Sequence, residues 1–262
     1  MATTSSQVPS AIRTKTFVER WYFTGMAIVM LIVSIAGFAP AIVHPDGRRA
    51  PLTLLATAHG IVFLAWLLLF LAQSLLVATR RVGWHRRLGF ASVGLLALMI
   101  PLGFGTTAAM VRRGFDLSGD SHVSAQPLIV EGKVTTLDAA TASVFNFGSL
   151  LEFTLLAIAA IGYRRRPEVH KRLMLFANIE LMGSPIQHLI GHIPRIVLTP
   201  AKVSIPFAVF LLAAVARDYL VAKRIRPLTA ALAIALFLSL PLEGAVIGPS
   251  AAWHHLAAWL AR

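Results

Sequence analysis

The chain has no cysteine among its 262 residues. Disulfide bonds, thiolate metal sites and cysteine nucleophiles are therefore excluded. Acidic residues are also scarce, since 11 Asp and Glu stand against 24 Lys and Arg, which leaves a formal net charge of +13. The sequence contains no Walker loop, dinucleotide fingerprint, G-x-S-x-G or H-E-x-x-H pattern. Nucleotide hydrolysis, soluble dehydrogenase chemistry and α/β-hydrolase chemistry are thus unsupported.

Apolar residues are abundant instead. They make up 57% of the chain, charged residues make up 13%, and the mean hydropathy is +0.74. The cations stand in short clusters between apolar runs, so membrane topology explains them better than nucleic-acid binding does. The polar start MATTSSQVPSAIRTKTFVER lacks the apolar core of a cleaved signal peptide. This composition predicts a polytopic membrane protein.

Segments of about 20 or more mostly apolar residues are long enough to cross a bilayer as helices. There are seven of them, at 21–43, 52–78, 87–110, 139–163, 171–198, 203–222 and 227–247. Lipid offers the backbone no hydrogen-bond partner, so each should be helical and the fold all-α. Pro241 and Glu243 interrupt the last segment near its outer end.

Lys and Arg are distributed unequally between the two sides of this arrangement. The N-terminus and the loops 79–86, 164–170 and 217–226, with the helix starts beside them, hold most of the 24 cations. The positive-inside rule then places the N-terminus in the cytoplasm and the C-terminus outside a bacterial inner membrane.

This topology predicts three parts. They are a cytoplasmic tail at 1–20, a transmembrane domain at 21–247 with an outer loop at 111–138, and an interfacial helix at 248–262. Within the outer loop, LIVEGKVTTLD is patterned like a short hairpin.

Polar side chains inside spanning helices are functional candidates, because they are costly unless they face a cavity or a partner. His59, His188 and His192 are expected at a similar depth near the outer side. His188 and His192 stand at i and i+4, so both can reach one metal ion. The sequence predicts a metal or proton-handling site there, and a hydrogen-bonded polar core is the alternative.

Two further polar layers are expected below these histidines. Glu152 and Glu180 lie at a similar depth near mid-membrane, where buried carboxyl groups would share a proton. They are candidates for catalysis or a proton relay, with packing as a protonated acid pair as the alternative. His85 and His170 lie at the inner boundary, either as haem or metal ligands or in contact with lipid phosphate. Asp218 is expected to form an interfacial ion pair with Arg217.

The stretches GWHRRLGF, at 83–90, and EVHKRLML, at 168–175, start two helices in nearly the same way. Each follows an inward helix and an Arg-rich turn, so helices two to five are interpreted as a duplicated helix-pair bundle. Topology alone is expected to explain the cations after each histidine.

These motifs, with His59 on the preceding helix, resemble a group of poorly characterised bacterial multi-helix membrane proteins with paired His-Arg helix starts. More distantly, residues 52–198 look like the di-haem transmembrane b-type cytochromes. The resemblance implies an inner haem site at His85 and His170, and an outer one at His59 with His188 or His192. Segment 139–163 contains no histidine, so the helix pairing of those cytochromes is not reproduced.

The sequence therefore predicts a His-lined membrane protein that binds haem b or a non-haem metal ion. It would serve electron transfer or act as a membrane oxidoreductase on a quinone or another lipophilic molecule, with Arg195 neutralising a haem propionate and the glutamates passing protons. Two alternatives are a proton-coupled transporter or channel without cofactor, and an accessory or assembly subunit that docks on partner subunits in a membrane complex.

Overall fold

The structure is a computed structural model that describes residues 10–44, 51–114, 123–124, 128–130, 133–193 and 200–262. Its elements in chain order are α1 (Ser10–Val43), α2 (Leu54–Ala78), α3 (Val82–Arg113), β1 (Val123–Ser124), β2 (Leu128–Val130), β3 (Lys133–Asp138), α4 (Ala139–Gly162), α5 (Pro167–Glu180), α6 (Gly183–Gly191), α7 (Pro200–Ala222), α8 (Pro227–Pro241), the π-helix η2 (Leu242–Ile247) and α9 (Ala251–Leu260).

Six segments of the described chain are long and apolar enough to cross a membrane. They are Phe17–Val43, Leu54–Ala78, Val82–Arg113, Ala139–Gly162, Lys202–Ala222 and Pro227–Ile247. The prediction of a helical membrane protein is thereby confirmed. The prediction of a seventh continuous helix over 171–198 is wrong, because the helix is interrupted after Glu180 and a second helix begins at Gly183.

The break separates α5 from α6 by only two residues, and α6 begins at Gly183. Glycine weakens a helix, and Pro185 in the first turn of α6 has no N–H to donate. An interrupted backbone would be costly in lipid, so the break requires surrounding protein.

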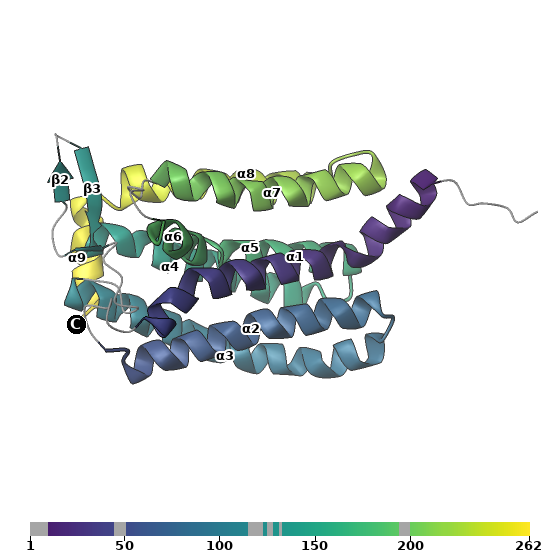
Figure 1. Ribbon diagram of the computed structural model, residues 1–262, viewed down its shortest axis with the longest axis horizontal. Coiled ribbons are helices and arrows are strands. Elements are labelled where there is room, and N and C mark those ends of the chain that lie inside the picture. Colours follow the sequence, from purple (N-terminus) through teal and green to yellow (C-terminus); the bar gives the residue numbers. More distant parts are fainter. Residues whose placement is uncertain (1–9, 45–50, 115–122, 125–127, 131–132, 194–199) are drawn as a thin grey trace, which may run out of the picture.

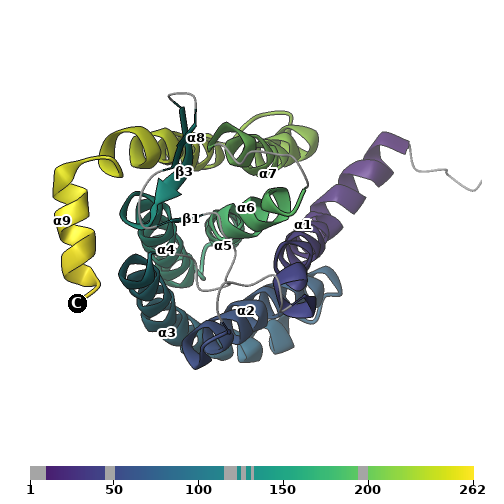
Figure 2. The same ribbon diagram turned by 60° about the vertical axis from the view of Figure 1, so that its left-hand side comes forward.

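The surrounding helices meet that requirement. Most helices run along the long axis of the molecule, whereas α9 lies across one end (Figure 1). In the turned view, α5 and α6 lie inside a ring formed by α1, α2, α3, α4, α7 and α8 (Figure 2). The contacts agree, since α5 packs against α1, α4, α7 and α8, and α6 packs against α1 and α7.

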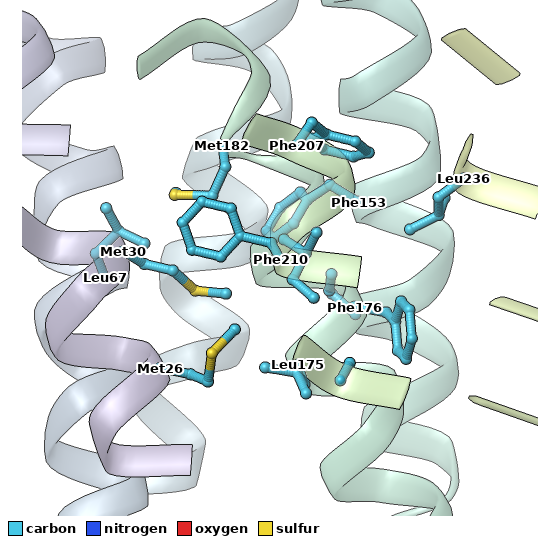
Figure 3. Packing of buried hydrophobic residues seen from close by; sticks show 14 of the residues in the cluster. Met26, Met30, Leu67, Phe153, Leu175, Phe176, Met182, Phe207, Phe210 and Leu236 are labelled. Carbon is cyan, nitrogen blue, oxygen red and sulfur yellow. The ribbon is translucent and has the colours of Figure 1, made fainter. Parts of the chain in front are cut away.

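The largest buried side chains pack around this central pair. Phe153 of α4, Phe176 of α5 and Phe207 of α7 are at most 1% exposed, and Met30 of α1 and Met182 at the break are fully buried. Figure 3 shows these side chains converging between the helices. Lipid is as apolar as they are, so close van der Waals packing holds the bundle together here.

The two ends of the bundle differ in chemistry. The turns between α2 and α3, α4 and α5, and α7 and α8 carry arginine clusters and lie at the end that we call the basic end. The opposite end carries β2, β3 and α9 and is called the sheet end (Figure 1).

A buried ion pair at the basic end joins α5 to α7. Arg172, only 4% exposed, donates from Nη2 to Oδ1 of Asp218 at 2.6 Å and from Nε to Oγ1 of Thr229 on α8 at 3.1 Å. Arg217 also donates to Asp218, at 3.1 Å, which confirms the pair predicted between them. The prediction that topology alone explains the cations after His170 is wrong for Arg172, because its charge is used inside the protein.

The sheet end also departs from a purely helical fold. β2 pairs with β3 as an antiparallel hairpin, as LIVEGKVTTLD predicts, and β1 pairs with β3 in parallel. The C-terminal α9 docks on the start of α4, where the Trp253 indole N–H donates to the Ala140 carbonyl at 2.8 Å.

Breaking the buried ion pair should destabilise the fold. The substitution Arg172→Ala removes one of the two cations that contact Asp218 among the described residues. Arg217 still compensates the charge, so we expect a cost of about 2–3 kcal/mol from the lost hydrogen bonds to charged groups. Unfolding by SDS in mixed micelles measures this cost. The matched control Arg165→Ala removes an exposed arginine of the same end and should change the free energy of unfolding by less than about 1 kcal/mol.

Two glycines of α1 should respond oppositely to alanine. A Cβ on Gly37 would overlap the Pro185 carbonyl just after the break, whereas Gly25 has nothing within 4 Å. We expect Gly37→Ala to lower the free energy of unfolding by about 1–3 kcal/mol, and Gly25→Ala to raise it by about 0.5–1 kcal/mol. Equal effects of the two substitutions would contradict the tight contact between α1 and α6.

Candidate functional site

His59, the outer histidine of α2, contacts residues of α2 and α3. The His59 ring stacks on Phe63, with ring centroids 4.0 Å apart and planes 26° apart. Its Nδ1 lies 3.3 Å from Oγ1 of Thr106 on α3. His59 therefore faces α3.

The other two predicted outer ligands lie at α6. His188 is 2% exposed and its ring centroid is 4.6 Å from that of Phe38 on α1, while His192 is the residue that caps the C-terminal end of α6. Among the residues that the structure describes, no group of three or more His, Asp or Glu side chains is placed to hold a metal ion. The three histidines are thus not gathered into the metal site that their common depth predicts.

Two other predictions for the outer side cannot be placed. Arg195 and, within the outer loop, residues 115–122, 125–127 and 131–132 lie outside the described residues.

The inner histidines do meet. His85 lies in the first turn of α3 and His170 in the first turn of α5, and their ring centroids are 6.3 Å apart with planes 77° apart. Nδ1 of His170 lies 2.8 Å from the Ala160 carbonyl oxygen. Because a carbonyl can only accept, Nδ1 carries a proton and donates it, so Nε2 is the ring nitrogen that remains for another partner. Nδ1 of His85 is buried and has no hydrogen-bond partner among the described residues.

The two carboxyl groups predicted at mid-membrane also come together. Glu152 of α4 and Glu180, the last residue of α5, lie close enough to interact electrostatically. Ser239 of α8 donates to Oε2 of Glu152 at 3.3 Å, and Ser149 of α4 lies near Glu180. Glu180 is only 3% exposed, and its Oε2 is buried without a hydrogen-bond partner in the described part of the chain.

A third carboxyl group joins this pair, and sequence reasoning missed its role. Glu243 lies on the π-helix η2, is 7% exposed, and interacts electrostatically with Glu152 and Glu180. Its carboxyl group fills the space beside Gly148 of α4, where any Cβ would overlap it. A signal was available in the sequence, because Glu243 is the only acidic residue between 227 and 247. An ionisable residue inside a membrane-spanning helix is a functional candidate by default. The sequence interpretation treated it only as an interruption.

The C-terminal histidine pair is partly structural. Nε2 of His254 lies 3.1 Å from Oγ1 of Thr141 and 3.8 Å from Oδ1 of Asp138, which caps the start of α4. His254 thus helps to attach α9 to the bundle, whereas its neighbour His255 is exposed.

No protein-family model, curated protein or solved structure matches the chain. The likeness to His-bearing membrane families therefore stays a prediction from its short motifs. The fold itself defines the class of the protein. Six long apolar helices around a buried, broken and polar crossing make it a polytopic integral membrane protein.

Proposed function

We propose that the protein is a membrane electron-transfer protein in which His85 and His170 would hold a b-type haem near the basic end. The observation that carries this proposal is the meeting of the two rings across the bundle. Two imidazoles on opposite sides of one metal atom, each bound through a bond of about 2 Å, place their ring centroids roughly 6 Å apart. The separation of 6.3 Å fits that requirement.

The surroundings of both rings suit a ligand pair. Metal-binding histidines usually donate their second ring N–H to a carbonyl or carboxylate, which sets the tautomer and the ring orientation. The Ala160 carbonyl plays this part for His170 and leaves Nε2 as the ring nitrogen that could bind a metal. The backbone of Gln73 hydrogen-bonds to the His85 ring, whereas its buried Nδ1 has no partner among the described residues and could bind a ligand. A haem bound here would supply one-electron transfer, and the chain would hold it and orient it.

The orientation of the protein in the membrane is proposed from the distribution of its Lys and Arg residues. The arginine clusters of the basic end favour the cytoplasmic side of a bacterial inner membrane, with the C-terminus outside. An electron donor or acceptor in the lipid, such as a quinone or another lipophilic molecule, would reach a site between helices from the bilayer.

A proton-coupled transporter without cofactor is the second candidate. The buried carboxyl groups of Glu152, Glu180 and Glu243 favour it, because intramembrane acids often line the path of a transported proton or ion. The two candidates differ in whether the purified protein carries a coloured group.

An optical spectrum of the purified protein tests the haem proposal. We expect a Soret band that shifts on dithionite reduction, and we expect His85→Ala and His170→Ala each to lower haem content at least tenfold, because each removes a side chain that would hold the haem. The matched control His255→Ala removes an exposed histidine and should retain the wild-type spectrum. A colourless, iron-free protein from haem-supplemented cells would rule out the haem and leave the transporter.

A further inference from the structure

We infer that Glu152, Glu180 and Glu243 form one proton-binding site inside the membrane, with the π-helix η2 supplying its third member. The ligand of this site is a proton, which one carboxylate takes from water and later returns to water. The inference does not depend on whether the protein binds haem.

The three carboxyl groups come from three different elements. Glu152 projects from α4, Glu180 ends α5 at the break, and Glu243 lies on η2. Close packing of α4 against η2 brings them together. A Cβ on Gly148 would overlap the carboxyl group of Glu243, and a Cβ on Gly244 would lie 2.8 Å from the Phe145 ring.

No cation compensates this cluster among the described residues. The groups that act on the three carboxyls there are the carboxyls themselves with Ser149 and Ser239. Carboxylates this close in an apolar bundle repel one another, and burial disfavours their charged form, so we infer that at least one carboxyl holds a proton. The cluster is also not placed to hold a metal ion.

A second observation points to a bound proton. Oε2 of Glu180 is a buried acceptor without a partner in the described part of the chain, although Glu180 is only 3% exposed. A proton placed on this oxygen, or on a carboxyl turned towards it, would supply the hydrogen bond that it lacks. Glu152 is half-buried, whereas Glu180 and Glu243 are buried.

The π-helix is what brings in Glu243. Pro241 ends α8, and one wider turn follows in which Gly248 N–H donates to the Glu243 carbonyl at 2.7 Å. Single π-turns within α-helices often mark functional positions, because the extra residue re-aims the side chains around it. Here the turn directs Glu243 towards Gly148.

Infrared difference spectra of the purified full-length protein, taken between acidic and alkaline pH in H₂O and D₂O, test the inference. A buried protonated carboxyl has a C=O stretching band that shifts in D₂O. We expect this band in the wild type, and we expect Glu152→Gln, Glu180→Gln and Glu243→Gln each to remove it or change its frequency, because the three groups share one proton site. The matched control Glu19→Gln alters an exposed acid and should leave the band unchanged.

A second variant keeps all three acids. The substitution Gly148→Ala displaces the Glu243 carboxyl and should shift the band without removing a titrating group. Absence of the band in wild type overturns the site, and an unchanged band in both Glu243→Gln and Gly148→Ala overturns the assignment of Glu243. Size-exclusion chromatography of each variant serves as the folding control, since a variant that does not elute as a monodisperse species has failed to fold. A colourless protein that keeps the band would end the haem proposal and leave this one standing.

Discussion

The buried pair of Arg172 and Asp218 is the interaction on which the arrangement of this bundle depends. It ties α5, the most polar crossing, to α7 and α8 at the basic end. The ion pair is satisfied by Thr229 and Arg217 as well, so the charges are compensated although both side chains are nearly inaccessible. With α5 held in the centre, the six longer helices can face lipid around it (Figure 2).

The central segment of α5 and α6 is surrounded by other helices (Figure 2), so it tolerates features that a lipid-facing helix would not. It can break at residues 181–182 without exposing unpaired backbone to hydrocarbon, and it can end in a buried carboxylic acid. The break places Glu180 opposite Glu152, while the start of the same helix places His170 opposite His85. The two polar clusters are thus positioned by opposite ends of α5, one helix length apart.

Much of the fold could be predicted from hydropathy and charge. Bilayer-length apolar runs are local properties, so six of the seven expected helices agree with the candidate spans, apart from boundaries such as the start of α1 at Ser10. The hairpin of β2 and β3 was also readable, because alternation is a local pattern. The break between α5 and α6 could not be predicted in the same way. Glycines and prolines are compatible with a kinked continuous helix as well as with a broken one, and packing against the surrounding helices decides between the two.

The candidate site was likewise predictable in part from the sequence. Depth along a helix is set by residue count, so the layers of His85 with His170 and of Glu152 with Glu180 could be expected. Depth says nothing about direction around the bundle, so His59 and His188, at similar depth, face α3 and α1 respectively. The sequence by itself determined a helical membrane protein and the depth of its polar groups, because bilayer thickness and helix rise are fixed lengths. Only the tertiary structure decided which of those groups meet, because rotation of each helix and the π-turn at Glu243 are set by packing against neighbours distant in sequence.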